Sequence, residues 1–271
     1  MNIQLRWLGN AGFEFQLGQT VLIVDPFLTR PRFIQTYFGH VAPDEAALRK
    51  YIPRCDAILV THAHFDHCMD APAIAMRTGA RVHGSANTCR LMRSAGLPAR
   101  QTHEIASGDD FEFNGIRVSA LPAAHPRIPG YTSGRLRRKL EFPLQLRDYR
   151  MDTCYSYLLE YEGTRILVWS STQPLNAPRA DLLTCRAVSS QRWYDRLLQQ
   201  VKPKLVLPQH WDDTYQPLSD APQPFFSAPH PGVPPIGRID LADFSARVRR
   251  AAPECAILAP DIFKSYSIEL A

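Results

Sequence analysis

Residues 59–70 read Leu-Val-Thr-His-Ala-His-Phe-Asp-His-Cys-Met-Asp, and this stretch decides how the rest of the chain is interpreted. Within six residues it holds three histidines and one aspartate: His62, His64, Asp66 and His67. Imidazole and carboxylate groups are ligands that suit zinc, iron or manganese. The apolar run at 57–60, just before them, is typical of a strand buried on both faces. Because α/β folds place binding sites in loops at the carboxyl ends of such strands, we expect a metal site here.

The spacing of these four side chains suits two adjacent metals. As the chain leaves the strand, His62 and His64 can point the same way, whereas Asp66 and His67 reach a second point on the turn. The alternative is a polar loop that is rich in histidine by chance. Burying four such groups without a metal would be costly, so we favour the metal site.

Outward from this stretch, the chain alternates short strands, hairpins and helices. Strands are predicted at 3–8, 13–17, 21–24, 81–83, 111–113, 116–121, 155–161, 165–169, 205–207 and 256–259. Helices are predicted at 70–78, 87–96, about 190–200, and after the N-cap candidate Asp240. Since strands and helices mix throughout without a linker, we expect one layered α/β domain over residues 1–271.

Two stretches do not fit this alternation. A basic insert at about 126–153 is rich in arginine, and a loop at about 217–237 holds seven prolines. Long loops in compact domains are often lids or binding segments. A solvated surface insertion is an equally good interpretation of both.

Composition excludes several classes of protein. With 45% hydrophobic and 21% charged residues in 271, the chain is neither disordered nor fibrous. No run reaches the ~18 apolar residues of a membrane helix. The first residues lack a secretory signal, and six scattered cysteines suggest reduced thiols, so we expect a cytoplasmic protein. The net charge of +5 lies partly in the basic insert, which favours a small anionic substrate over a polyanionic partner.

The His-x-His-x-Asp-His string at 62–67 resembles the signature of the metallo-β-lactamase superfamily. Residues 5–27 look like the first hairpin of that family and the strand end that carries its aspartate. They are most similar to the branch of ascorbate-phosphate lactonase and related metal-dependent hydrolases. The resemblance implies a four-layer αββα sandwich. It also matches Asp25 to an acidic residue that supports the histidine loop, although Asp25 could be a plain turn residue before Pro26.

The resemblance implies two more ligands, each of which could alone be an ordinary loop histidine. His125 follows the strand after the Asn-Gly hairpin, and His210 follows another apolar strand. One metal would then be held by His62, His64 and His125, and the other by Asp66, His67 and His210. We expect one or two Zn²⁺ ions per chain, with Mn²⁺ or Fe²⁺ as alternatives. Four further histidines match no family position: His40, His83, His103 and His230.

The sequence departs from the family where a metal-bridging aspartate is expected. Here the strand at 165–169 leads into Ser170-Ser171-Thr172, which puts Ser171 at that position. A hydroxyl is a weaker ligand than a carboxylate, so Ser171 is at most a weak bridging position. Two dications would share a single carboxylate, which favours a weak second site or single occupancy. Compensation could come from Asp181, Asp212 or Asp213. A second departure is Asn10, where close relatives often carry histidine.

The family resemblance implies hydrolysis by metal-activated water at an ester, lactone, amide or phosphodiester centre. Asp66 is the expected proton acceptor. In the basic insert, Arg135, Arg137 and Arg138 are candidates to receive a phosphate or carboxylate, or they mark a solvated surface. The partner would be a small-molecule substrate, and the oligomeric state is left open.

Ser171 motivates an alternative from another class, a metal-binding protein with lost or altered hydrolysis that acts as a sensor or interaction module. Two other activities of this superfamily fit less well. Iron-based redox chemistry, as in flavodiiron relatives, usually pairs this domain with a flavin domain, for which the chain has no room. Nucleic-acid processing would need insertions and appendages longer than those seen here.

Overall fold

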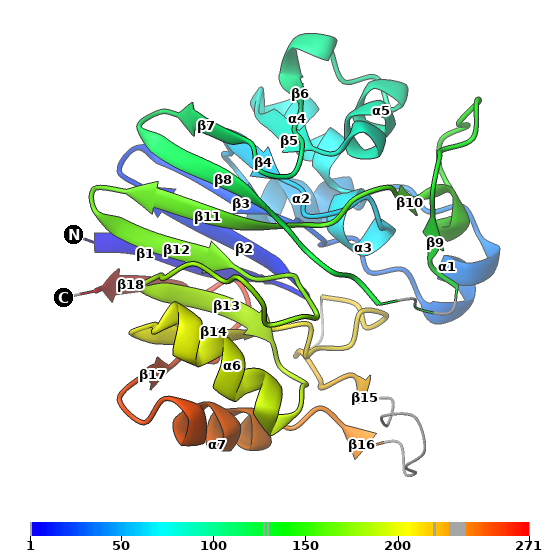
Figure 1. Cartoon of the computed structure of the whole chain (residues 1–271). Helices are drawn as coiled ribbons and strands as arrows, with labels where there is room; N and C mark the ends of the chain where they lie inside the picture. Colours follow the sequence, from blue (N-terminus) through cyan, green and yellow to red (C-terminus); the bar gives the residue numbers. More distant parts are fainter. Residues whose placement is uncertain (1, 127, 129, 219–220, 228–236, 271) are drawn as a thin grey trace.

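Two seven-stranded sheets lie face to face in the computed structural model, which describes residues 2–126, 128, 130–218, 221–227 and 237–270 (Figure 1). The N-terminal sheet has the order β18 (Ser265–Glu269), β1 (Asn2–Gly9), β2 (Gly12–Leu17), β3 (Thr20–Val24), β4 (Ala57–Leu59), β5 (Arg81–Gly84) and β6 (Thr102–Glu104). The C-terminal sheet has the order β17 (Ala256–Ile257), β14 (Leu205–Gln209), β13 (Leu182–Arg186), β12 (Thr164–Val168), β11 (Tyr155–Tyr161), β8 (Ile116–Pro122) and β7 (Asp110–Phe113).

Helices and pairs of two-residue strands make up the rest of the described secondary structure. The helices are α1 (Phe33–Phe38), α2 (Glu45–Tyr51), α3 (Phe65–Cys68), α4 (Ala71–Thr78), α5 (Ala86–Ser94), α6 (Gln191–Val201) and α7 (Leu241–Ala251), with 3₁₀ turns at Ala99–Gln101 and Leu146–Asp148. Two-residue strands form the pairs β9 (Thr132–Ser133) with β10 (Arg150–Met151), and β15 (Phe226–Ser227) with β16 (Gly237–Arg238). No helix among the described residues is long and apolar enough to cross a bilayer.

The centre of the N-terminal sheet is buried on both faces because β3 and β4 alternate between two cores. Leu22, Val24 and Leu59 join the core between the sheets. Ile23 and Ile58, one residue along, join a second core with side chains of α2, α4 and α5. Successive side chains of a strand point to opposite faces, so these apolar runs serve both layers. Each such side chain stabilises the fold by roughly 1.5–3 kcal/mol.

The C-terminal sheet is covered by α6 and α7 on its outer face (Figure 1). Tyr194, Leu197 and Val201 of α6 are fully buried against it. Asp240 accepts a hydrogen bond from the amide of Ala242 at 2.7 Å and so caps α7. Helices, sheet, sheet and helices therefore form four layers, which confirms the αββα sandwich expected from the resemblance.

The structure adds elements that the sequence patterns did not predict. β18 closes the edge of the N-terminal sheet beside β1, and α1 and α2 lie between β3 and β4 along the chain. β13 is also new, and it lies between β12 and β14 with all three strands parallel. The basic insert contains β9 and β10, whereas most of the proline-rich loop lies outside the described residues. A lid or binding role for either stretch therefore stays a prediction.

Parallel pairing determines where the polar loops meet. β3 and β4 are parallel, with Val24 paired to Leu59, so Asp25 and the loop that begins at Thr61 lie at the same edge. On the other sheet, β12, β13 and β14 end together, which brings the residues after Val168, Cys185 and Gln209 to one edge. Loops at such carboxyl-terminal edges are where α/β folds place binding sites.

Candidate metal centre

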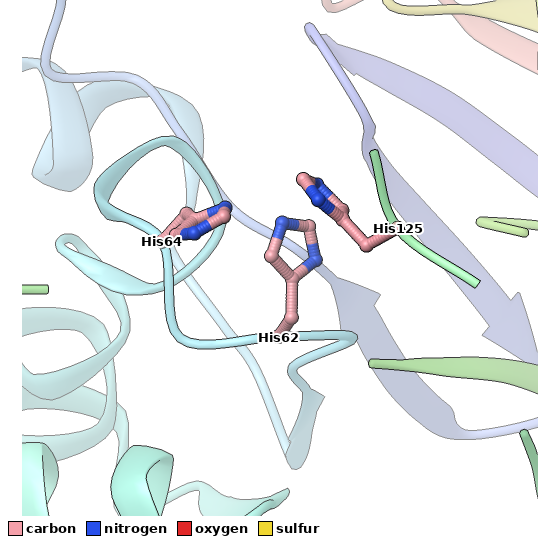
Figure 2. Close-up of side chains that lie close together, drawn as sticks. All are labelled: His62, His64 and His125. Atoms are coloured by element: carbon pink, nitrogen blue, oxygen red, sulfur yellow. The ribbon is translucent and has the colours of Figure 1, made fainter. Parts of the chain in front are cut away.

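Two groups of three side chains come together between the sheet edges. His62, His64 and His125 form the first set, and Asp66, His67 and His210 form the second. Within each set, the candidate ligand atoms lie within 4.8 Å of one another. The sets adjoin, because the ring centroids of His62 and His67 are only 3.9 Å apart. Figure 2 shows the three rings of the first set grouped together, and their centroids lie 4.5 to 4.9 Å apart in every pair.

Each histidine of the first set has one ring nitrogen committed to a protein oxygen. Nε2 of His64 lies 3.2 Å from the carbonyl oxygen of Thr132, and Nδ1 of His125 lies 2.7 Å from that of Pro126. A carbonyl only accepts hydrogen bonds, so these nitrogens carry the hydrogen and the opposite nitrogens keep a lone pair. Nδ1 of His62 lies 3.0 Å from Oγ1 of Thr61. That hydroxyl itself donates to Asp25, so it accepts from His62.

The second set is held by Asp25 and Asn10. Nδ1 of His67 donates to Oδ2 of Asp25 at 2.8 Å, which turns Nε2 of His67 toward the centre. Asp25 is fixed in turn, because its Oδ1 accepts from the amide of Thr61 at 2.7 Å. Nδ2 of Asn10 donates to Oδ2 of Asp66 at 3.2 Å. Asp25 thus makes the contact that a residue supporting a metal ligand requires.

Several buried polar atoms of the two sets have no partner among the described residues. These atoms are Nε2 of His62, Nδ1 of His64 and Oδ1 of Asp66. Leaving such groups unpaired costs about 1–3 kcal/mol each. All three are the atoms left over after the other end of the side chain has bonded to protein. A divalent cation would satisfy Nε2 of His62 and Nδ1 of His64 together, so the donors of the first set fit a metal.

Three non-glycine residues of this site have a left-handed backbone. Asn10, Asp25 and His210 have φ values of 51°, 47° and 55°, in the left-handed region. Non-glycine residues adopt this region rarely, although asparagine, aspartate and histidine do so most readily. The amide of His210 donates to the carbonyl oxygen of Asn10 at 3.1 Å, which joins the two sheet edges. At these three positions the strained backbone directs a side chain toward the centre.

Burial keeps most of the imidazoles neutral. It lowers the pKa of His62 well below its usual range, that of His64 to about 4 and that of His210 to about 3. His67 differs, because the carboxylates of Asp25 and Asp66 outweigh burial and raise its pKa. For Asp66, His67 and His210 outweigh burial and lower the pKa of the carboxyl. Neutral imidazole and ionised carboxylate are the forms that bind metal.

Ser171 is engaged in a different set of contacts. Its hydroxyl donates to the carbonyl oxygen of Gln173 at 3.0 Å and accepts from the amides of Gln173 and Ala124, both at 3.1 Å. One donor and two acceptor positions are all that a serine hydroxyl offers. A bridging role for Ser171 would therefore require breaking backbone contacts.

The three aspartates suggested as compensation are also engaged elsewhere. Asp212 pairs with Arg30 at 2.8 Å, Asp181 accepts from the amide of Arg165, and Asp213 accepts from the amide of Tyr215. Among the described residues, Asp66 is the one acidic member of either set. The missing carboxylate is therefore not replaced by these aspartates.

The arginines predicted to bind substrate are not brought to the site. Arg135, Arg137 and Arg138 are exposed, and none lines the cavity beside the two sets. Their backbone carbonyls instead accept hydrogen bonds from Arg150 and Arg90. These contacts fix the backbone of this part of the insert, and the three arginine side chains are exposed. That these three arginines receive the substrate therefore stays a prediction, without a contact in the described cavity.

A cavity of about 320 Å³ opens onto both sets. Its other described lining residues include Ile128 and Tyr131 of the insert, and Arg186, Phe225 and Ile239 from the C-terminal half. Sequence reasoning missed Arg186 because the strand that it ends was not predicted. The available signal was the apolar run Leu182-Leu183-Thr184-Cys185 just before it.

The remaining described histidines lie in other contacts. The rings of His83 and His103 stack with centroids 4.8 Å apart, and Nδ1 of His40 lies 2.6 Å from the carbonyl oxygen of Pro143. None of them belongs to either set. His230 lies outside the described residues.

Known proteins resemble this chain in sequence. Residues 20–183 match the family described as "Beta-lactamase superfamily domain". A "UPF0173 metal-dependent hydrolase" of Pyrobaculum arsenaticum is 32% identical over 49% of this chain and 55% of its own length. One of Thermococcus onnurineus is 25% identical over 82% of this chain and 90% of its own. Several matches, like the first, span only about half the length of the curated relative.

Solved structures resemble the chain in fold. The metallo hydrolase Igni18 of Ignicoccus hospitalis superposes with a TM-score of 0.66 at 16% identity, over 100% of both chains. The metallo-beta-lactamase fold protein YhfI of Bacillus subtilis has a TM-score of 0.59 at 13% identity, over 98% of this chain and 99% of its own. With its family match, its four-layer fold and its histidine loop, the chain belongs to the metallo-β-lactamase superfamily.

Proposed function

We propose that the protein is a metal-dependent hydrolase that cleaves an ester, lactone or phosphodiester bond of a small anionic substrate. The observation that carries this proposal is the convergence of unpartnered atoms of His62, His64 and Asp66 beside a cavity. Relatives named as metal-dependent hydrolases support the reaction class. The cavity is of the size that takes a small molecule.

We propose zinc as the metal, because the two sets are built mainly of imidazole, with Mn²⁺ or Fe²⁺ as alternatives. His62, His64 and His125 would hold one ion, and Asp66, His67 and His210 would hold a second, weaker one. A bound divalent ion supplies Lewis acidity and lowers the pKa of water to about 7, which provides a nucleophile at neutral pH.

Asp66 is the residue that we assign to proton transfer. Asn10 holds its Oδ2, while its Oδ1 is buried and has no partner among the described residues. Oδ1 is therefore the atom that accepts a proton from the attacking water and returns it to the leaving group. Tyr131 lines the same cavity, and burial raises the pKa of its phenol well above the usual range. The phenol thus stays protonated.

The second candidate function is a metal-binding protein with lost or altered hydrolysis, which acts as a sensor or interaction module. It is favoured by the hydrogen-bonded hydroxyl of Ser171 and by the single carboxylate of the two sets. Both functions share the metal centre and differ in turnover. A single domain over residues 1–271 and a cytoplasmic location also remain predictions.

Metal analysis together with a hydrolysis panel tests the proposal. Protein purified without chelators is measured by mass spectrometry, and it is assayed on p-nitrophenyl acetate, a γ-lactone and bis(p-nitrophenyl) phosphate. We expect bound metal and turnover of at least one substrate in the wild type. Both should be lost in His64→Ala but kept in His40→Ala, a histidine outside both sets. Metal without turnover would favour the sensor, and absence of metal would contradict both functions.

A further inference from the structure

Arg186 is a cation in the cavity without an anionic partner among the described residues. It is the last residue of β13, it is half-buried, and its side chain lines the cavity beside the metal centre. Its Nε is shielded from solvent and makes no hydrogen bond within the described chain. Burial lowers the pKa of the guanidinium, which means that the surroundings disfavour its charge. Since arginine stays charged near neutral pH, this position lacks a counter-ion.

Other arginines show that this situation is unusual. Three of them, Arg30, Arg77 and Arg150, also have a buried Nε without a partner. Each of the three uses its other nitrogens, which contact Asp212 in Arg30 and backbone carbonyls in Arg77 and Arg150. Among the described residues, the side chain of Arg186 has no hydrogen-bond or ion-pair partner. Its donors are therefore free for a ligand.

The backbone holds Arg186 rigidly next to the metal centre. Arg186 pairs in register with Gln209, which directly precedes His210. The side chain of Gln209 is fixed by Thr184 at 3.1 Å and by the carbonyl oxygen of Trp169 at 2.9 Å. The charge of Arg186 also contributes, after burial, to lowering the pKa of His125 and of His210. An anion bound to Arg186 would therefore lie beside both ligand sets.

The residues next to Arg186 in the cavity wall indicate the chemical nature of the rest of the substrate. Val188, Phe225, Phe226 and Ile239 line the cavity together with Arg186. These side chains offer no charge, so they suit a hydrocarbon or aromatic body. Arginine presents a planar fork of donors that matches the oxygens of carboxylate and phosphate.

We propose that Arg186 binds the anionic group of the substrate, a carboxylate or a phosphate carried on an apolar body. This inference rests on the proposed function, because it assumes that the scissile bond lies at the two ligand sets. Arg186 is then a specificity-determining residue, a role that the sequence suggested for Arg135, Arg137 and Arg138 of the insert. The substrate class is thus an amphiphilic anion, and a neutral ester of the same shape would bind less well.

Direct binding tests this role independently of hydrolysis. Full-length protein, as purified and with its metal content measured, is titrated by calorimetry with phenylphosphonate, benzoate and the neutral control benzyl alcohol. We expect Arg186→Gln to raise the Kd of at least one anion by about tenfold or more. The anion with the larger change identifies phosphate-like or carboxylate recognition. Arg186→Lys should weaken binding less, because it keeps the charge and loses the fork.

Three results would overturn the inference. The first is an unchanged anion affinity in Arg186→Gln, or in Arg186→Met if the glutamine variant does not fold. The second is an equal loss of benzyl alcohol binding, which would indicate a change of cavity shape. The third is an equal effect of Arg135→Gln, the matched control for an exposed arginine of the insert. Failure of the proposed function would give a different result. The wild-type protein would lack metal or turnover, but it would still bind the anion through Arg186.

Discussion

The two sheet edges that meet at the cavity are built differently. The N-terminal edge consists of Asp25 after β3 and the loop 61–70 after β4. The C-terminal edge consists of residues at the ends of four strands, namely His125 (β8), Ser171 (β12), Arg186 (β13) and His210 (β14). The N-terminal edge contributes four of the six candidate ligands, which Asp25, Asn10 and backbone groups hold in place.

The C-terminal edge contributes the other two ligands, His125 and His210, along with a hydrogen-bonded serine and a cation without a counter-ion. The difference suggests a division of roles. One edge is organised to hold metal, while the other determines the charge of the cavity and so the choice of substrate. Changes at the N-terminal edge should therefore affect metal and turnover, and changes at Ser171 or Arg186 of the C-terminal edge should affect stability or selectivity.

The largest effect should come from Asp66→Asn at the N-terminal edge. The amide cannot accept the proton at Oδ1, so kcat/KM on a substrate found in the hydrolysis panel should fall about 10²–10⁴-fold. Steady-state kinetics and metal analysis measure the two consequences separately. A variant that retains most of the wild-type kcat/KM would contradict the role of Asp66.

Arg30→Met should disturb the connection between the edges. Arg30 pairs with Asp212 at 2.8 Å, with 3% and 1% of the two side chains exposed, and Asp212 also accepts from the amide of Asn10. Leaving Asp212 charged and unpaired should lower the free energy of unfolding by about 3–5 kcal/mol. Urea unfolding measures this change. Lys264→Met, which removes an exposed pair with Asp261, should have no measurable effect.

Asp25→Asn should weaken the metal site without abolishing the fold. The amide cannot accept from His67 and Thr61 as the carboxylate does, so metal affinity should fall about 10–100-fold. Competition with a chromophoric chelator measures the affinity. Asp261→Asn at the surface is the control. Unchanged affinity would mean that Asp25 is only a turn residue.

The smallest effect on metal should come from Ser171→Ala at the C-terminal edge. Two amides and a carbonyl would lose their partner, so the free energy of unfolding should fall by about 1–3 kcal/mol. Metal content should stay the same. Loss of metal in this variant would show that Ser171 does act as a ligand.

Local patterns made much of this architecture predictable. The loop 62–67 holds its ligands within one short span, and the strands before it show the alternation of a buried sheet. The four layers followed from the family resemblance, and the structure confirms them. The resemblance also suggested His125 and His210, and the structure brings each beside the expected partners, although metal binding itself stays a prediction.

Contacts between distant segments could not be predicted in the same way. Arg186 reaches the cavity through the pairing of β13 with β14, which no local pattern reveals. The contact of Asn10 with Asp66 crosses 56 positions of sequence. The arginines at 135–138 looked like an anion site because their charges are clustered. The contacts that turn this segment outward come from Arg90 and Arg150, outside the cluster.

Anomalous diffraction from crystals grown with zinc tests the metal centre most directly. The account predicts a peak about 2.0–2.1 Å from Nε2 of His62 and Nδ1 of His64, because these are the nitrogens without a protein partner. A second, weaker peak is expected among Asp66, His67 and His210. No peak at either set, or coordination of His64 through Nε2, would contradict the account.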